Sequence, residues 1–105
     1  MVIVGFDTIA ALITREKRQR PQQGRTLDRR IAAWKQEVEQ ARWREPTEVK
    51  AVFGRADVVG GNRIVFDVCG NNYRLVVLCD YVVGIVEVRF AGTHAEYDKI
   101  DARRI

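Results

Sequence analysis

The sequence predicts an α+β fold, with two N-terminal helices on one face of an antiparallel sheet and a short C-terminal helical turn. Two observations predict it. Apolar residues in the first half recur every three or four positions, as on one side of a helix, and in the second half they alternate with polar residues, as in a half-buried strand. With 105 residues, we expect one domain over positions 1–105.

Composition excludes several classes of protein. Apolar residues make up 47% and charged residues 30%, which is typical of a globular chain. The chain has no Ser and one His, which rules out a Ser-His-Asp hydrolase, and with two Cys it argues against a structural zinc site; we expect no metal and no cofactor. Without a long apolar run or a signal peptide, we expect a cytoplasmic protein with no membrane contact. The net charge of +4 mildly favours polyanions.

The first helix follows a short edge strand at positions 2–4, and Asp7 is its expected N-cap. The polar stretch 15–25 contains Pro21 and Gly24, which predicts a helix end followed by a solvated loop. Its basic residues favour a solvated helix end over a contact with RNA or an acidic partner; they are Arg15, Lys17, Arg18 and Arg20.

The second helix is expected to start at Thr26 as its N-cap. Its apolar stripe recurs at steps of four and three, and we expect it to be core; it consists of Leu27, Ile31, Trp34, Val38 and Ala41. Pro46 closes this region, and one further helical turn at 47–53 ends at Gly54.

Strands are predicted at 57–59, 63–69, 73–81 and 85–91. Gly70-Asn71-Asn72 is typical of a hairpin, and its register places Phe66 opposite Leu75, Ile64 opposite Val77 and Val68 opposite Tyr73. Val88 and Phe90 join this apolar face. The opposite face is expected to carry the polar residues, which are Arg63, Asp67, Arg74, Asp80, Glu87 and Arg89.

Three arginines therefore share one face, and two interpretations stand. They could form ordinary cross-strand ion pairs, such as Arg74 with Asp67. They could also bind phosphates, which match the planar guanidinium fork. The two interpretations are evenly balanced for Arg63. For Arg74 and Arg89 phosphate binding is favoured, because the segment after the last strand brings further polar groups to the same edge of the sheet.

The segment after the last strand carries the chemistry. Thr93 and Glu96 have the spacing of a capping box, and His94 and Tyr97 then share one side of the turn. With Lys99, they supply the groups of a metal-free ribonuclease, whose nucleophile is the 2′-hydroxyl of the substrate. The alternative for His94 is a structural polar residue at a helix end.

Four stretches carry a resemblance to a known family: residues 33–43, 46–50, 59–77 and 88–102. The last contains the run Gly-Thr-His-Ala-Glu-Tyr-Asp-Lys-Ile-Asp-Ala at 92–102, which is the ending typical of the family. On these residues the chain resembles the HigB toxins, relatives of RelE in type II toxin–antitoxin modules. The first 30 residues match that family poorly.

The resemblance implies a RelE-like fold and an mRNA endonuclease that acts on the ribosome and inhibits translation. It implies a HigA-like helix-turn-helix antitoxin as partner, through which alone the protein would contact DNA. It implies catalytic roles for Arg74, Arg89, His94, Tyr97 and Lys99. It implies RNA-binding roles for Asn62, Arg63 and Tyr73, and it leaves the acid and the base unassigned. The alternative is an inactive RelE-like module that binds RNA or antitoxin within a repressor complex.

Overall fold

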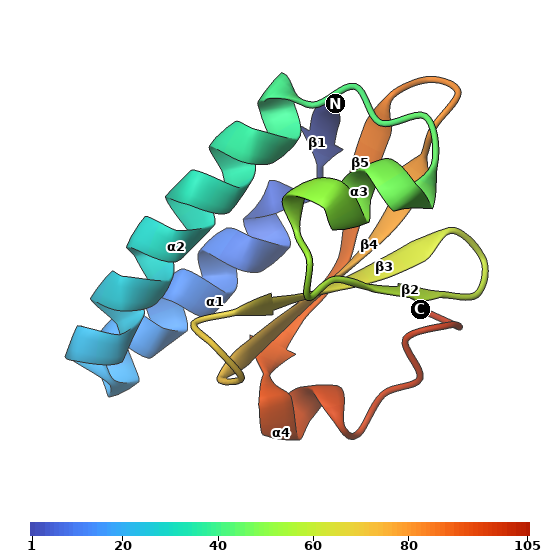
Figure 1. The fold of residues 1–105 in the computed structure, drawn as a ribbon. Helices are drawn as coiled ribbons and strands as arrows, with labels where there is room; N and C mark the ends of the chain where they lie inside the picture. Colours follow the sequence, from blue (N-terminus) through green and yellow to red (C-terminus); the bar gives the residue numbers. More distant parts are fainter.

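Four helices and one five-stranded sheet build the protein (Figure 1). The computed structural model describes residues 1–105 as β1 (Val2–Val4), α1 (Phe6–Gln19), α2 (Pro21–Gln40), α3 (Pro46–Val52), β2 (Asp57–Val59), β3 (Arg63–Val68), β4 (Tyr73–Asp80), β5 (Ile85–Thr93) and α4 (His94–Tyr97). No helix has the length and apolar character needed to cross a membrane. The predicted α+β class is confirmed.

The sheet has the order β1-β5-β4-β3-β2. Strands β2 to β5 pair antiparallel, as predicted, and β1 pairs parallel with β5, so the sheet is mixed. The expected edge strand at the start of the chain thus takes its backbone partners from the last strand. The N-terminal and C-terminal strands are therefore neighbours.

The two long helices form a tight hairpin, so the loop expected at 15–25 is wrong. Only Arg20 separates α1 from α2, and Pro21 occupies the first turn of α2, where its missing N–H is not needed. Gly24 lies inside α2 against α1, since a Cβ there would lie 2.4 Å from the backbone N of Lys17. Thr26 is therefore inside the helix and is not its N-cap. At α1 the N-cap is Gly5, with φ 81°, so the expected cap at Asp7 is also wrong.

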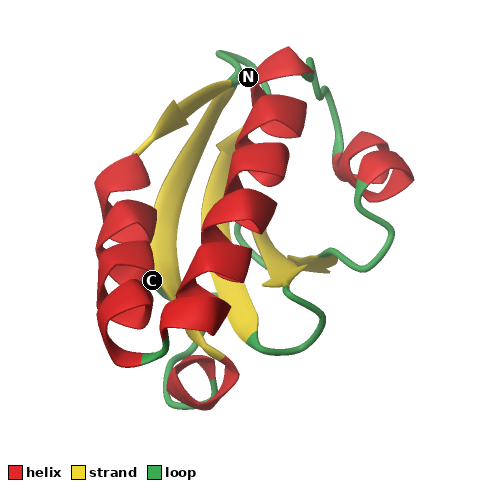
Figure 2. Ribbon diagram, turned by 90° about the vertical axis from the view of Figure 1, so that its left-hand side faces the viewer, coloured by secondary structure: helices red, strands yellow, loops and turns green.

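The main core lies between these helices and one face of the sheet (Figure 2). The stripe predicted on α2 is buried at Leu27, Ile31, Trp34 and Val38, and α1 adds Ile9, Leu12 and Ile13. Trp34 is 5% exposed and meets the Phe66 ring edge-on at 5.6 Å. The prediction that Trp34 belongs to the core is confirmed.

The predicted β3–β4 register is confirmed, but β5 departs from simple alternation. Val88 pairs with Val77 and Phe90 pairs with Val76, so a β-bulge leaves Arg89 as the extra residue. The bulge turns Phe90 to the face opposite the helices, where it contacts Val76. The expectation that Phe90 joins the main core is wrong for this reason.

The segment after α4 folds back over the face opposite the helices. Val65, Val76 and Ala102 form a second buried cluster there, with Ile100 and Ile105 packed against it. Part of the face that was expected to carry the polar residues is therefore covered by this segment.

Candidate active site

Arg74 lies near the start of β4, on the face of the sheet opposite the helices. Its Nε is 3.2 Å from Oδ1 of Asp67 on β3, which is the cross-strand pair expected from the register. One guanidinium nitrogen also donates to the Asn71 carbonyl at 3.3 Å. The side chain is 11% exposed, so its position is well defined by its neighbours.

Tyr97 of α4 lies over this arginine. The guanidinium carbon of Arg74 is 5.8 Å from the centre of the Tyr97 ring, within the range of a cation–π contact. The same ring is 6.4 Å from that of Phe90, which the bulge has turned to this side. Strands β4 and β5 and helix α4 thus meet at the Arg74–Tyr97 pair.

His94 opens α4 beside the β3–β4 hairpin. Its backbone N–H donates to the Asn72 carbonyl at 3.0 Å, and its Nδ1 lies 3.2 Å from Oδ2 of Asp98. The predicted capping box is confirmed, because Thr93 Oγ1 accepts from the N–H of Glu96 and the Glu96 carboxylate accepts from the N–H of Thr93. The imidazole is 40% exposed and is accessible from solvent.

Glu96 has a partner that the sequence did not indicate. Arg15 of α1 binds its carboxylate through both terminal nitrogens, at 2.9 and 2.7 Å. This side-chain hydrogen bonding, with the backbone N–H of Thr93, lowers the pKa of Glu96 to about 2. Arg15 stood out in the sequence only as part of a basic run, and no local pattern indicates a partner 81 residues away.

Two residues predicted for the site lie at its margin. Arg89 pairs with Glu87 at 2.6 Å. It lies three positions along β5 from Gly92, the neighbour of Arg74, which is roughly 10 Å of strand. Lys99 lies in the turn after α4, where it is exposed and makes no ion pair. Neither side chain forms a hydrogen bond or ion pair with Arg74 or Tyr97.

Asn62 and Arg63 lie at the other end of β3. Arg63 donates through Nε to the Ile105 carbonyl at 2.6 Å and through a terminal nitrogen to the Gly61 carbonyl at 3.0 Å. Asn62 occupies the preceding turn with φ 61°. Arg63 is four residues from Asp67, the partner of Arg74, or roughly 13 Å along the strand. The structure therefore does not bring these two residues to the Arg74–Tyr97 pair.

Tyr73 lies on the opposite side of the sheet, against the helices. It is 3% exposed, and its hydroxyl donates to the buried carboxylate of Glu16 at 2.6 Å. Burial raises the pKa of Glu16, but the hydrogen bonds from Tyr73, Arg15 and Arg20 and the charge of Arg20 together hold that pKa below its usual range. The RNA-binding role expected for Tyr73 does not fit this placement, because side chains alternate between the faces of a strand and Arg74 faces the other way.

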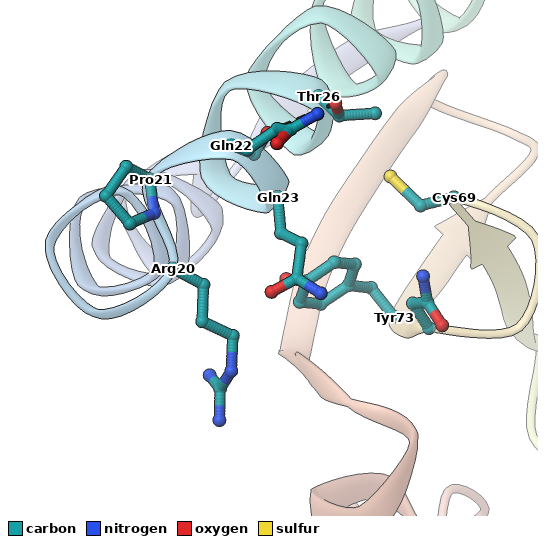
Figure 3. Close-up of a pocket in the computed structure, with 8 residues that line it drawn as sticks. Arg20, Pro21, Gln22, Gln23, Thr26, Cys69 and Tyr73 are labelled. Carbon is teal, nitrogen blue, oxygen red and sulfur yellow. Dashed lines mark hydrogen bonds between the residues drawn. The ribbon is translucent and has the colours of Figure 1, made fainter.

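A cavity of about 590 Å³ lies on this helix side as well, between the start of α2 and the β3–β4 hairpin. Figure 3 shows Arg20, Gln23 and Thr26 on one wall and Cys69 and Tyr73 on the other. Neither Arg74 nor Tyr97 lines this cavity. No three His, Cys, Asp or Glu side chains come together to hold a metal ion.

Comparison with known proteins identifies the family. Residues 28–100 match the family model HigB toxin, described as the RelE-like toxic component of a toxin-antitoxin system. The comparison with curated proteins finds no match. The matched segment covers more than half of the chain and includes β2 to β5 and α4, so it contains the Arg74–Tyr97 pair. The protein belongs to the HigB toxin family of RelE-like toxic components of toxin–antitoxin systems.

Proposed function

We propose that this toxin is an endoribonuclease that cleaves mRNA held on the ribosome and so inhibits translation. The Arg74–Tyr97 contact carries the proposal, because a guanidinium suits a phosphate, and Tyr97 and His94 of the same short helix are of residue types that transfer protons. Membership in a RelE-like toxin family supports the same class of activity.

The reaction uses the 2′-hydroxyl of the RNA as nucleophile. Its oxygen attacks the adjacent phosphorus and the 5′-oxygen of the next nucleotide leaves, which yields a 2′,3′-cyclic phosphate and a free 5′-hydroxyl. One group removes the 2′ proton and another protonates the leaving oxygen. We assign these two steps to His94 and Tyr97 together, without fixing which is the base. The scheme needs no metal-bound water as nucleophile, since the nucleophile belongs to the substrate.

Positive charge completes the site. The guanidinium of Arg74 faces the charge that develops on the phosphorane, and its planar fork matches two phosphate oxygens. The other polar residues of this face follow the RNA chain on either side: Asn62, Arg63, Arg89 and Lys99. We expect the partners of such a toxin to be mRNA, the ribosome and a HigA-like helix-turn-helix antitoxin, all in the cytoplasm.

The test is single-turnover cleavage on ribosomes programmed with mRNA. His94→Ala and Tyr97→Phe should each lower the cleavage rate by about 10²–10⁴, the usual effect of losing a positioned acid or base. Lys50→Ala, on the exposed side of α3, should cleave at the wild-type rate. Thermal melts verify folding, and wild-type rates in both site variants would overturn the assignment.

A second candidate function is a module that binds RNA or antitoxin without cleaving. One observation favours it: three candidate groups already pair with carboxylates, Arg74 with Asp67, Arg89 with Glu87 and His94 with Asp98. A phosphate would have to displace these partners. Binding of the wild-type protein to programmed ribosomes without cleavage or growth arrest would favour this module over the nuclease.

A further inference from the structure

A clamp of two charged side chains, Arg15 and Glu96, joins α1 to α4. Figure 1 shows α4 directly after the end of β5. The guanidinium of Arg15 forms a bidentate pair with the carboxylate of Glu96. Two parallel hydrogen bonds fix the relative orientation of the two groups. Helix α4 has only four residues, His94–Tyr97, which are too few to form a stable helix on their own. Its position therefore depends on the groups that hold it.

Glu96 is the centre of the clamp on the α4 side. Its carboxylate caps the Thr93 N–H at 2.9 Å while it binds Arg15. Gly92 leaves room for it, since a Cβ there would lie 3.2 Å from Oε1 of Glu96 and 2.6 Å from the Phe90 ring. The carboxylate thus fits closely into the end of β5.

A second, buried carboxylate also binds Arg15. Its Nε lies 3.3 Å from Oε2 of Glu16, which is fully buried. Glu16 also accepts from the Tyr73 hydroxyl and from Arg20, at 2.6 and 3.0 Å. An arginine held at both its Nε and its terminal nitrogens has little freedom to move away from Glu96.

We propose that Arg15 is a positioning residue for the site, acting through Glu96 to hold α4 so that Tyr97 stays over Arg74 and His94 stays beside Asn72. The part of this inference that concerns cleavage rests on the proposed function. Arg15 touches neither Arg74, His94 nor Tyr97, so its loss should misplace the reacting groups without removing one. A misplacement of about 1 Å commonly costs about 10²-fold in rate.

The experiment compares Arg15→Gln with Lys17→Gln. Both remove one positive charge from α1, and Lys17 has an ion pair of its own with Asp28. Amide hydrogen exchange at Glu96, Asp98 and Lys99 reports the opening of α4, because these N–H groups form its hydrogen bonds. We expect these amides to exchange at least about tenfold faster in Arg15→Gln than in the wild type, and at the wild-type rate in Lys17→Gln.

Cleavage supplies the second measurement. On programmed ribosomes, Arg15→Gln should lower the maximal single-turnover rate by about 10²-fold and leave the half-saturating ribosome concentration unchanged. Arg15→Lys should recover part of the rate, because lysine restores the charge without the two-point contact. Lys17→Gln should cleave at the wild-type rate.

Glu96→Gln tests the same clamp from the other side. Glutamine preserves the capping box but not the ion pair. We expect the same loss as in Arg15→Gln, and no further loss in the double variant, as for two residues that act through one contact. This variant also decides the question if Arg15→Gln fails to fold.

The outcomes separate the two proposals. Wild-type exchange at α4 in both clamp variants would overturn the positioning role. Faster exchange with wild-type cleavage would overturn the assignment of the reaction to α4, and with it the role of Arg15 in cleavage. If the wild-type protein does not cleave, the proposed function fails, while hydrogen exchange still decides whether Arg15 holds α4.

Discussion

Tyr73 and Tyr97 show how one residue type takes two roles in this protein. The Tyr73 phenol is buried and donates to a buried carboxylate on the helix side. The Tyr97 ring is partly exposed and packs on Arg74 and Phe90, and its hydroxyl has no hydrogen-bond partner. The first residue stabilises the fold, and we propose that the second takes part in the reaction.

Tyr73→Phe should destabilise the protein by about 1–3 kcal/mol, because it leaves the buried carboxylate of Glu16 short of a donor. Denaturant unfolding measures the change. Tyr97→Phe is the matched control, and we expect it to stay within about 0.5 kcal/mol of wild type. An equal effect of the two substitutions would contradict the structural role of the Tyr73 hydroxyl.

At the scale of elements, the α1–α2 hairpin depends on one glycine. A Cβ at Gly24 would lie 2.4 Å from the Lys17 nitrogen and 2.5 Å from the Lys17 Cα, which are backbone atoms that a rotamer change cannot move. The helices must therefore separate to admit a side chain. Arg15 and Glu16 lie on the turn of α1 next to this contact, so the hairpin also sets the position of the clamp.

Gly24→Ala should cost about 1–3 kcal/mol in unfolding free energy, as for other overpacked sites. Gly54→Ala is the control, since a Cβ at Gly54 would meet nothing within 4 Å and the φ of this residue is not positive. There we expect no loss, and a gain of about 0.4–1 kcal/mol where the backbone suits alanine. A neutral Gly24→Ala would show that α1 and α2 can pack further apart.

The α1–α4 clamp predicts a pH dependence of stability. The pKa of Glu96 is about 2 in the folded protein, well below its usual value. A carboxylate with a depressed pKa stabilises the fold above its unfolded pKa, and this contribution is lost as the pH falls through the folded pKa. Arg15→Gln removes the main cause of the depression.

Thermal melts from pH 6 to pH 2 measure this contribution. The Tm difference between wild type and Arg15→Gln should be constant above about pH 5 and should shrink between about pH 4.5 and pH 2. Lys17→Gln should show a smaller difference, because its ion pair is exposed. A wild-type advantage of equal size at pH 2 and pH 6 would contradict the clamp.

For the whole molecule, charge and site placement predict dependence on the ribosome. The net charge of +4 supplies limited affinity for a single strand, and two of the four candidate cations, Arg74 and Arg89, already have acidic partners. The groups that we propose to react, His94 and Tyr97, lie on one partly exposed turn of helix. We therefore expect the bound ribosome to supply the in-line orientation of the scissile phosphate.

Cleavage of the same mRNA, free and on programmed ribosomes, tests this dependence. We expect weak cleavage of free RNA that falls further as salt rises, and much faster cleavage on ribosomes. Equal rates on the two substrates would show that the protein aligns the RNA by itself. His94→Ala on ribosomes sets the background rate.

The sequence by itself determined the order of the elements, the β3–β4 register, the capping box of Thr93 and Glu96, and the family. These features repeat with the period of a helix or a strand, or lie within a few residues of one another, so local geometry suffices to predict them. The face that carries Arg74 followed from the same alternation. The same alternation also placed Tyr73 on the helix side of the sheet. The resemblance to the family, in contrast, implied that Tyr73 binds RNA.

Only the tertiary structure decided which distant groups meet. The bulge at Arg89 and the turning of Phe90 depend on how β5 packs against β4, and the Arg15–Glu96 clamp joins residues 81 positions apart. The need for glycine at position 24 likewise arises only from the packing of α2 against α1. Such contacts follow from the packing of whole elements, for which a single sequence carries no periodic signal. Of the two residues that we propose to hold the site together, the sequence marked Glu96 as part of a capping box, but nothing in it indicated the partner, Arg15.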